Sequence, residues 1–575
     1  MNVQRSSHQG LRVSIAQCSH TGIKAENQDF HGALIPEGKA LTLKGITLAV
    51  ADGISSSPVS REAAELSVRA MLEDYYHTSD AWAVRAAASR VISAINAWLY
   101  AANRRALLDT ADHGRICTLS ALILKGGFAH ILHVGDSRIW RVSGETLEPL
   151  TQDHVARSSI GETVLKRALG LYDQIEPDYQ KLNLTRGDIF LLTSDGVHDF
   201  WNIQQAVATI KAAPDLQAAA DHIVADALNA GSTDNLTLQI VRIEQLPETL
   251  GPVALGLNSD LPILQHQSEG AMVDGFRIIR LIHSNNRSHI YLAEGANGQR
   301  VALKFPATET QKDPVYMRRF IMEEWIARRL NSPHVIKAAE TPETRSSLYV
   351  VSEFIDGQTL RQWMADNPNP PINLVRDIAQ QMIKGLRAFH RKDMLHQDFR
   401  PENIMITTDG TVKIIDLGST RIAGVQEAGP SELEQMLGTL QYSAPEYIVG
   451  DIPTAASDQF SLGLVIYEML TGRLPYRADA ARVETRRDVA RLSYRDARDG
   501  SNTIPYWIDH ALKRATHPDP AKRFGAFSEF EEALRAPPQH LSAQGPTPLI
   551  KRDPLRFWQA LSAILALILI AVLAN

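Results

Sequence analysis

The sequence predicts an α+β chain that contains two globular domains and a C-terminal transmembrane helix. Its 575 residues exceed the usual size of one domain. A stretch rich in Pro, Gly and polar residues, without helical or strand periodicity, separates two regions of about equal size, and an uncharged apolar run follows the second. We therefore expect domains over 8–245 and 273–535, a linker over 246–272, a Pro-rich segment over 536–554 and the membrane helix over 555–574.

The composition is typical of soluble globular domains, with 44% hydrophobic and 22% charged residues. A formal net charge of −6 gives no reason to expect a nucleic acid as a partner. Neither cysteine, Cys18 or Cys117, has a metal-ligand spacing, so we expect two reduced thiols in a cytosolic core rather than a disulfide. The first ten residues contain no apolar run, which argues against a signal peptide.

The C-terminal run has the length of a membrane span. Residues 557–574 carry no charge, and a helix of this length rises about 27 Å, close to the ~30 Å hydrocarbon core. A buried amphipathic helix is the alternative, but apolar residues cover the whole circumference. Because Lys551, Arg552 and Arg556 precede the run, the positive-inside rule predicts cytoplasmic domains and a single-pass C-terminal anchor in the inner or plasma membrane.

In the first region, aspartates recur at the ends of apolar strands. They occur at Asp52-Gly53, Gly135-Asp136, Asp195-Gly196 and, before a strand, Asp234-Asn235. A single Asp-Gly is most often a turn, because Gly accepts positive φ and Asp bonds its own backbone. Four carboxylates at one edge of packed sheets would repel one another unless cations bound them, and oxygen ligands select hard ions such as Mg²⁺ or Mn²⁺. Two such ions can activate a bridging water and hold a phosphoryl group.

Five motifs in this region resemble those of the metal-dependent protein phosphatases of type 2C. They are Lys24-Ala25-Glu26-Asn27-Gln28-Asp29, Ala51-Asp52-Gly53, Val134-Gly135-Asp136-Ser137-Arg138, Thr193-Ser194-Asp195-Gly196 and Asp234-Asn235-Leu236-Thr237, in this order. The resemblance implies a β-sandwich flanked by helices, layered α/β/β/α. It also implies that two Mg²⁺ or Mn²⁺ ions are held, directly or through water, by Asp29, Asp52, the Gly53 carbonyl, Asp195 and Asp234, and that Asp136 serves a third.

Two positions depart from this family pattern. Lys24 stands where the family commonly has a phosphate-binding Arg, and Ile54-Ser55-Ser56 replaces the usual small-residue run after Asp-Gly. Lys24 is still cationic, but an ammonium cannot bind phosphate bidentately. We therefore expect Lys24 to bind the phosphate of the substrate with lower affinity.

The second region begins rich in strands and becomes helical. Val301-Ala302-Leu303-Lys304 is predicted as a strand, and 320–330 has helical spacing. A lysine on a strand usually faces solvent. Here Glu323, on the following helix, could clamp Lys304 in the ion pair that positions the phosphates of ATP.

The most specific motif is Leu-His-Gln-Asp-Phe-Arg-Pro-Glu-Asn over 395–403, followed one strand later by Ile-Asp-Leu-Gly over 415–418. It has the residues of a phosphoryl-transfer loop. Asp398 would accept or orient the proton of the substrate hydroxyl, and Arg400 would neutralise the transferring phosphoryl group. Asn403 and Asp416 would carry Mg²⁺.

Together these residues resemble the eukaryotic-like protein kinases over 274–534, which implies a bilobal fold. Residues 438–446 look like the end of an activation segment, 457–463 like the helix behind the catalytic loop, and Arg523 like the partner of Glu446. Thr439 favours the Ser/Thr branch over tyrosine specificity. The backbone of the hinge, 353–355, would recognise adenine. The implied ATP site comprises Ile282, Ile290, Ala302, Lys304, Glu353, Ile355, Asn403, Met405 and Asp416.

The nucleotide loop departs from the kinase pattern. In HSNNRSHIY, over 283–291, the positions expected to be glycine are His283, Asn285 and Ser288. Glycine normally lets the backbone approach the phosphates, so these side chains could weaken or reshape ATP binding.

The catalytic motifs contain three further substitutions. Gln397 replaces the usual Arg, Leu417 replaces Phe, and Arg400 stands in place of Lys. Without an Arg at 397, the coupling between catalysis and a phosphate on the activation segment is weaker. We therefore predict that kinase activity does not require such a phosphate. Arg400 keeps the charge of Lys with a different geometry.

Two functions compete on this sequence. In the first, a bifunctional enzyme of bacterial signalling uses ATP with Mg²⁺ to phosphorylate Ser/Thr of proteins, removes such phosphates with two or three Mg²⁺ or Mn²⁺ ions, and also acts on itself. In the second, an active phosphatase carries a pseudokinase that binds nucleotide or partners as a scaffold. The glycine-poor loop favours the second. The joint presence of Lys304, Glu323, Asp398, Asn403 and Asp416 favours the first.

Overall fold

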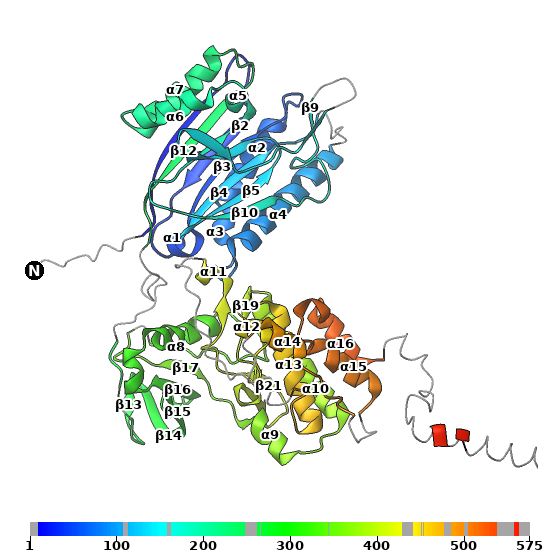
Figure 1. Ribbon diagram of the computed structural model, residues 1–575. Coiled ribbons are helices and arrows are strands. Elements are labelled where there is room, and N and C mark those ends of the chain that lie inside the picture. Colours follow the sequence, from blue (N-terminus) through cyan, green and yellow to red (C-terminus); the bar gives the residue numbers. More distant parts are fainter. Residues whose placement is uncertain are drawn as a thin grey trace, which may run out of the picture.

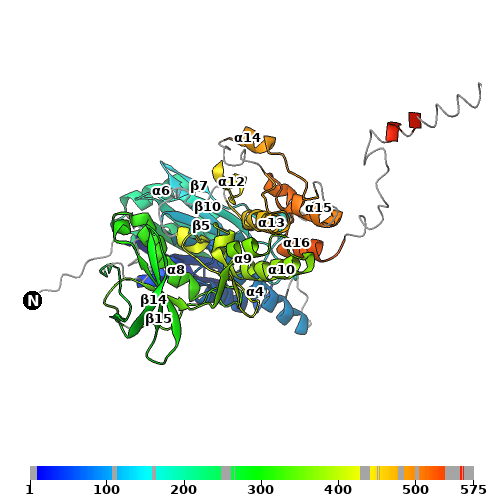
Figure 2. The same ribbon diagram turned by 90° about the horizontal axis from the view of Figure 1, so that it is seen from below.

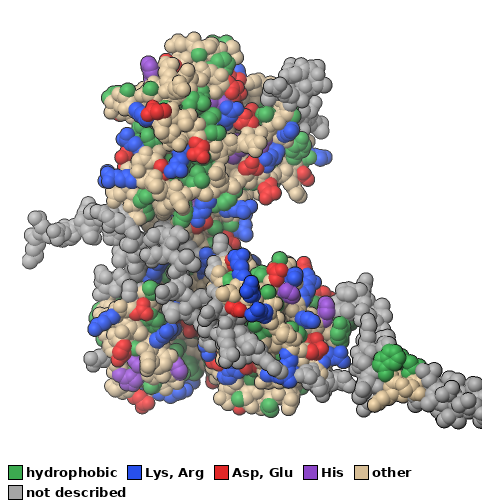
Figure 3. Space-filling model, viewed as in Figure 1, with side chains coloured by type: hydrophobic (Ala, Val, Ile, Leu, Met, Phe, Trp, Pro, Cys, Tyr) green, Lys and Arg blue, Asp and Glu red, His purple; other side chains and the backbone are tan. Residues whose placement is uncertain are grey.

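The computed structural model describes residues 10–106, 113–157, 163–247, 261–264, 266–342, 344–427, 441–449, 451, 453–476, 485–498, 504–537, 557–559 and 561–562. These residues form an N-terminal and a C-terminal domain that lie end to end (Figure 1). On the face shown in Figure 3, acidic and basic side chains are mixed over both domains. Most of the described residues therefore fall into these two domains.

The N-terminal domain is built on two five-stranded antiparallel sheets. The first has the order β1-β12-β11-β6-β7, with β1 Arg12–His20, β12 Leu236–Gln245, β11 Ile189–Thr193, β6 Arg138–Ser143 and β7 Thr146–Pro149. The second has the order β10-β5-β4-β3-β2, with β10 Asp178–Asn183, β5 Phe128–Val134, β4 Leu119–Lys125, β3 Ile46–Asp52 and β2 Asp29–Leu34. A separate hairpin joins β8 Val155–Arg157 to β9 Thr163–Leu165.

The two sheets face each other across an apolar core and carry helices on their outer faces. Leu48 and Val50 of β3 meet Phe190 and Leu192 of β11 between the sheets. The outer face of the second sheet is covered by α2 Ser60–Leu72 and α4 Val84–Arg105, and that of the first by α6 Ile203–Ala212 and α7 Leu216–Asn229. The shorter helices are α1 Gly38–Lys44, α3 Asp74–His77 and α5 Asp195–His198. This is the α/β/β/α layering that the resemblance implied.

Strand β3 is buried on both faces, which explains why its sequence does not alternate between apolar and polar residues. From Ile46 to Ala51 every residue is buried, because one face of the strand packs on the opposite sheet and the other on α2. A strand buried on both faces has a continuous apolar sequence rather than an alternating one. Only at its end, at Asp52, does the chain reach the edge where polar groups gather.

The C-terminal domain has two lobes, the first of which is a twisted sheet with one helix. The sheet has the order β13-β14-β15-β16-β17, with β13 Met272–Val273, β14 Phe276–Ser284, β15 Ser288–Glu294, β16 Arg300–Pro306 and β17 Val350–Glu353. After the 3₁₀ turn Thr308–Lys312, helix α8 spans Pro314–Ala327. The Asp313 side chain accepts hydrogen bonds from the amides of Val315 and Tyr316, and Pro314 at the first helical position fixes the start of α8.

The second lobe is mainly helical and lies beside the sheet lobe (Figures 1 and 2). Its helices are α9 Leu360–Asp366, α10 Ile372–His390, α11 Ala423–Gln426, α12 Pro445–Ile448, α13 Ala455–Thr471, α14 Arg486–Arg491, α15 Tyr506–Ala515 and α16 Phe527–Arg535. Its short strands are β18 Gly357–Thr359, β19 Met394–Leu395, β20 Ile404–Thr407, β21 Val412–Ile414 and β22 Arg421–Ile422. The central helix α13 is buried along most of its length, and Thr454 and Ser457 form a capping box at its start. The bilobal expectation is thus met.

Part of the predicted linker belongs to the sheet lobe. Leu261 and Leu264 pack against apolar residues of this lobe, and the amide of Leu348 donates to the carbonyl of Pro262 at 2.9 Å. Met272, predicted as the last linker residue, already pairs with Arg277. The Pro-rich composition concealed these apolar anchors.

The predicted membrane helix, 555–574, and most of the Pro-rich segment before it lie almost entirely outside the described residues. Of the span, only 557–559 and 561–562 are described, and they are helical. No helix within the described ranges combines the length and the apolar character needed to cross a membrane.

Candidate active sites

The N-terminal candidate site lies where aspartates gather at one edge of the two sheets. Asp29 begins β2 and lies directly opposite Asp52 at the end of β3. Asp195 follows β11 and starts α5, Asp234 precedes β12, and Asp136 follows β5. The fold therefore brings together, from five separate chain segments, the aspartates predicted from the sequence.

The carboxylates of this site are buried or half-buried and lie close to one another, which disfavours their charged forms. Burial, followed by the charge of Asp195, raises the pKa of Asp136 to about 7. Burial also raises the pKa of Asp29 to about 6, against the hydrogen bonds that it accepts. The pKa of Asp52 is raised well above its ordinary value by burial and then by Asp29 and Asp195. A cation between these groups would relieve this repulsion.

Two buried oxygens test whether the site fits metal ions. Oδ1 of Asp29 and Oδ1 of Asp195 are buried and have no hydrogen-bond partner among the described residues. Buried carboxylate oxygens without partners are costly unless a cation binds them. No group of three His, Cys, Asp or Glu side chains in the described ranges is already arranged to hold an ion. The donor set is nevertheless all oxygen, as Mg²⁺ and Mn²⁺ require.

Sequence reasoning assigned no role to three polar residues that orient this site. Ser194 and Thr237 both donate hydrogen bonds to Oδ2 of Asp29, at 2.8 and 2.7 Å. The side chain of Asn235 accepts from the amide of Gln28 at 2.8 Å and donates to the carbonyl of Thr21 at 2.8 Å. Because these bonds leave only Oδ1 of Asp29 unsatisfied, they aim that atom at the other carboxylates. All three residues belong to the motifs that contain these aspartates, and that was the available signal.

Lys24 lies at the edge of the same site. Its ammonium forms a short ion pair with Asp234 and donates to the hydroxyl of Ser55 at 2.5 Å. The side chain of Lys24 is 25% exposed, so its charge can be reached from solvent. Gly53 has no room for a side chain, because a Cβ there would lie 2.8 Å from the backbone of Ser60.

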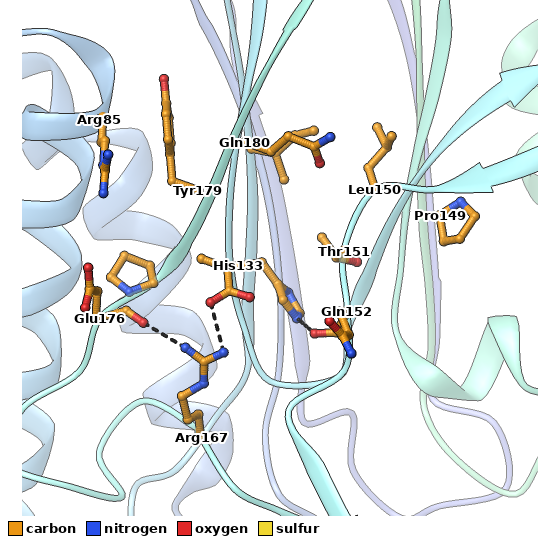
Figure 4. Close-up of a pocket in the computed structure, with 13 residues that line it drawn as sticks. Arg85, His133, Pro149, Leu150, Thr151, Gln152, Arg167, Glu176, Tyr179 and Gln180 are labelled. Carbon is orange, nitrogen blue, oxygen red and sulfur yellow. Dashed lines mark hydrogen bonds and ion pairs between the residues drawn. The ribbon is translucent and has the colours of Figure 1, made fainter.

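A pocket of about 650 Å³ lies along β5 and β10 and is lined by none of the predicted site residues (Figure 4). On its wall, Arg167 donates to the carbonyl of Glu176 at 3.2 Å and pairs with Asp178 at 2.9 Å. His154 links this wall to the turn before Asp136, since its ring nitrogen Nδ1 accepts from the amide of Gly135 at 3.1 Å. The pocket wall thus supports the position of that turn.

The C-terminal candidate site contains the predicted ion pair. Nζ of Lys304 lies 2.6 and 2.8 Å from the two carboxylate oxygens of Glu323. Oδ1 of Asp416 lies 3.8 Å from the same ammonium. Burial opposes the charge of Lys304, but Asp416 and Glu323 raise its pKa above the ordinary value, while Lys304 lowers the pKa of Asp416. Helix α8 and the sheet are therefore joined by this ion pair.

The catalytic loop is held by Asn403 and Asp458. Nδ2 of Asn403 donates to both the carbonyl and the carboxylate of Asp398, each at 2.9 Å. The buried carboxylate of Asp458 accepts from the amides of His396 and Gln397 at 3.0 and 3.1 Å. Asp458 fixes the loop from behind, a role that sequence reasoning did not assign to it. Burial raises the pKa of Asp398, which suits a group that takes up a proton.

Arg400 belongs to the same loop, and its Nε donates to Glu402 at 2.7 Å. Farther away, Arg523 and Glu446 form the predicted pair, with two N–O distances of 2.7 Å and almost no exposed surface. A buried bidentate pair fixes the end of the activation segment against the helical lobe. Thr439, the predicted marker of Ser/Thr specificity, lies outside the described residues.

The glycine-poor nucleotide loop closes through a side chain. Oδ1 of Asn285 accepts from the amides of Arg287 and Ser288, each at 2.9 Å, and the amide of Asn285 donates to the carbonyl of Ser288 at 3.1 Å. Tyr316 of α8 donates to the carbonyl of Arg287 at 2.8 Å. Asn285 thus makes the tight turn for which the kinase pattern uses glycine.

The remaining predicted ATP-site residues surround Lys304. Ile290 on β15 lies opposite Lys304 on β16, and Ala302 points to the same face as Lys304, two residues away. Ile290, Ala302 and Met405 are half-buried, Ile355 is buried and Ile282 is exposed. The carboxylate of Glu353, at the predicted hinge, is paired with Lys413 at 2.7 Å. The side chain of Glu353 is therefore occupied by this ion pair, and the role in adenine binding is expected of its backbone.

Family models match both halves of the chain: "Protein phosphatase 2C" over 16–231 and "Protein kinase domain" over 279–537. The kinase PrkC of Bacillus subtilis is 27% identical over 269 residues, which make up 46% of this chain and 41% of PrkC. PknA of Corynebacterium glutamicum is 32% identical over 212 residues, 36% of this chain and 45% of PknA. The chain thus spans less than half the length of these relatives.

Solved phosphatase structures match the N-terminal half. The Ser/Thr phosphatase PstP/Ppp of Mycobacterium tuberculosis is 22% identical, with a TM-score of 0.35, and the match covers 40% of this chain and 99% of that one. Another structure is the catalytic domain of PstP in complex with two manganese ions, 22% identical with a TM-score of 0.34, covering 41% of this chain and 100% of that one. With the family matches and the geometry of both sites, the chain is a protein phosphatase 2C domain fused to a Ser/Thr protein kinase domain.

Proposed function

We propose that this chain is a bifunctional signalling enzyme that phosphorylates Ser and Thr of proteins and hydrolyses such phosphoesters. The phosphatase domain would span 8–245 and the kinase domain 273–535. The observation that carries the proposal is that the paired Lys304 and Glu323 stand beside Asp416 in the same chain as the clustered aspartates of the phosphatase edge. A decayed kinase has no need of that ion pair, so the pseudokinase alternative is less well supported.

In the kinase, Asp398 would receive the proton of the substrate hydroxyl as the phosphoryl group is transferred. Asn403 keeps this carboxylate in place, and burial favours its protonated product form. Lys304 would hold the phosphates of ATP, and Arg400 would offset negative charge at the transferring group. Asn403 and Asp416 are the residues that would hold Mg²⁺, which neutralises phosphate charge when bound.

In the phosphatase, Asp29, Asp52, Asp195, Asp234 and the carbonyl of Gly53 would hold two Mg²⁺ or Mn²⁺ ions, with Asp136 at a third. Bound ions of this kind lower the pKa of a water and bind phosphoryl oxygens. Ser194 and Thr237 orient Asp29. Lys24, already at the edge of the site, would attract the phosphate of the substrate, and its displacement from Asp234 would follow when cations bind.

The test is transfer of labelled γ-phosphate by the Asp195→Asn chain to itself and to a generic protein acceptor. Silencing the phosphatase prevents removal of the label. We expect label that disappears when Asp398→Asn is added, because the substrate proton then has no acceptor. Hydrolysis of a phosphoserine peptide by the chain with native Asp195 tests the other activity. A folded chain that carries no label with Mg²⁺ or Mn²⁺ supplied would instead establish a phosphatase with a pseudokinase.

We also propose that the C-terminal segment 555–574 anchors the enzyme in the membrane, with both domains in the cytoplasm. The support is its uncharged apolar run and the basic residues before it. Deletion of residues 551–575 is expected to move the protein from the membrane pellet to the supernatant after ultracentrifugation. Continued sedimentation of the truncated chain with membranes would reject the anchor.

A further inference from the structure

A loop of the phosphatase domain, residues 78–83 between α3 and α4, is packed into the kinase domain next to α11 (Figure 1). The amide of Gly424 in α11 donates to the carbonyl of Ala81 at 2.9 Å. Ala81 has no exposed surface and belongs to the hydrophobic core of the helical kinase lobe, together with Leu43 of the phosphatase. The loop is therefore a component of the packing of the kinase.

The same loop reaches two further kinase segments. Asp80 pairs with Arg329, just beyond the end of α8, at 3.4 Å. The indole nitrogen of Trp82 donates to the carbonyl of Arg391, at the end of α10, at 3.1 Å. The loop thus contacts α11 and the residues just beyond the ends of α8 and α10, three segments from different parts of the kinase sequence.

The contact requires glycine at position 424. A Cβ there would lie 2.5 Å from the carbonyl oxygen of Asp80 and 2.6 Å from that of Trp82. Both obstacles are backbone atoms, which cannot rotate away as a side chain can. The backbone of Gly424 is not in the left-handed region, so its absent side chain serves the approach of the loop rather than a turn.

A buried charge forms the second part of the interface. The ammonium of Lys125, at the end of β4, has no exposed surface and donates to the carbonyl of Gly424 at 2.7 Å. The carboxylate of Glu427 lies 3.6 Å from it and accepts from the amide of Val84 at 2.8 Å. Both polar partners that the described residues give Lys125 come from the kinase. A buried ammonium without partners would destabilise the fold, so Lys125 of the phosphatase depends on the carbonyl of Gly424 and the carboxylate of Glu427 in the kinase.

Glu427 also completes the longest helix of the phosphatase domain. Val84 is the first residue of α4, and Ala83 before it has no side chain that could cap the helix. The carboxylate of Glu427 occupies that capping position and lies at the positive end of the helix dipole. A residue of the kinase therefore caps a helix of the phosphatase.

The contacted kinase segments carry or adjoin its catalytic groups. Helix α8 bears Glu323, and α11 follows Asp416 within the same chain segment. Arg391 is followed by β19, and β19 leads directly into the loop that contains Asp398. Strand β19 also pairs with β22. In this docked arrangement, Lys304 and Glu323 are in contact. In kinases an Arg at the position of Gln397 binds a phosphate on the activation segment. Because this chain has Gln there, the activation segment needs some other contact to hold it in place.

We propose that the phosphatase domain is also a structural activator of the kinase, with the surface formed by 78–84 and Lys125 as the docking site for α11 and Glu427. This role rests on the proposed kinase activity and is independent of phosphoester hydrolysis. Docking holds α8, α11 and the segment before the catalytic loop in the arrangement that transfers phosphate, and replaces the restraint that an activation-segment phosphate provides elsewhere.

The test uses two variants of the full chain that break the interface from opposite sides, Gly424→Val in the kinase and Trp82→Ala in the phosphatase. Gly525→Ala is the matched control, because a Cβ at this exposed kinase glycine meets only the end of the Glu529 side chain, at 3.7 Å. Hydrogen exchange at 78–84 and 421–427 reports docking. Label transfer is measured with Asp195→Asn added, and phosphopeptide hydrolysis with native Asp195.

We expect both interface variants to raise exchange at both segments and to lower transfer by roughly tenfold or more, within the range of coupled sites. Hydrolysis and the Gly525→Ala chain should be unchanged. Lost docking with unchanged or increased transfer would overturn the activating role, and unchanged exchange would overturn the docking assignment. If the chain that carries only Asp195→Asn transfers no label, the proposed kinase activity itself is wrong. That outcome differs from a failure of the docking proposal, because the chain is then inactive before the interface is changed.

Discussion

Asp195→Asn is expected to lower hydrolysis of a phosphoserine peptide by at least about 10²-fold, because even the loss of a residue that only supports a metal ligand costs 10–100-fold. Asp195 starts α5 at the sheet edge, and its Oδ1 is buried with no partner among the described residues. Asparagine keeps the shape of the side chain but removes the charge that a divalent cation needs. The measurement is the initial rate of phosphate release with Mg²⁺ and with Mn²⁺.

The control for this variant is Asp173→Asn, an exposed aspartate of the same domain. It makes the same chemical change away from the sheet edge and should keep full activity. Label transfer by the kinase should survive Asp195→Asn, because the folded structure is retained. Normal hydrolysis by Asp195→Asn would show that this aspartate is not a metal ligand.

Lys304→Ala is expected to reduce transfer of γ-phosphate by at least about 10²-fold, the usual cost of removing one group that stabilises transition-state charge. Its ammonium lies 2.6 Å from Glu323 and 3.8 Å from Asp416. Without it, the carboxylate of Glu323 would lose its cationic partner and remain close to that of Asp416, so α8 would also lose its link to the sheet. Binding of ATP and label transfer in the Asp195→Asn chain are the two measurements.

Lys384→Ala serves as the matched control, since Lys384 is an exposed residue of α10 far from this ion pair in the sequence. Phosphopeptide hydrolysis measured with native Asp195 should be retained by both lysine variants. Simultaneous loss of both activities in Lys304→Ala would indicate unfolding of the chain rather than a specific role in transfer.

The sequence predicted most of each site because catalytic groups here stand in short motifs. Asp52 and Asp195 were identified from the strands that end in them, Asp29 from the resemblance of its motif to the type 2C phosphatases, and Lys304 and Glu323 from the spacing between a strand and a helix. The roles of Ser194, Thr237 and Asp458 could not be predicted in this way. Each acts through a hydrogen bond to a distant segment, as Thr237 does to Asp29, and such contacts depend on strand order rather than on local pattern.

The interface between the domains was also beyond sequence reasoning. Lys125 is followed by Gly126-Gly127 and would be expected in an exposed hairpin, as lysines next to glycine turns usually are. In the structure it is fully buried, and its ammonium donates to the carbonyl of Gly424 in α11 of the other domain. Asn285 shows the same limit on a smaller scale. The sequence suggests that its side chain could weaken or reshape ATP binding, and it gave no sign that this side chain also closes the turn that glycine would have allowed.

The burial of Lys125 has a consequence for how the chain is made. Its hydrogen-bond partner, Gly424, is 299 residues later in the sequence. At about 5–20 residues per second, the ribosome needs roughly 15–60 s to synthesise that stretch. During this interval the phosphatase domain can fold while its docking surface is still open to water and to neighbouring nascent chains. Because the phosphatase domain precedes the kinase domain in the chain, its docking surface stays uncovered until the kinase domain has been synthesised and has folded.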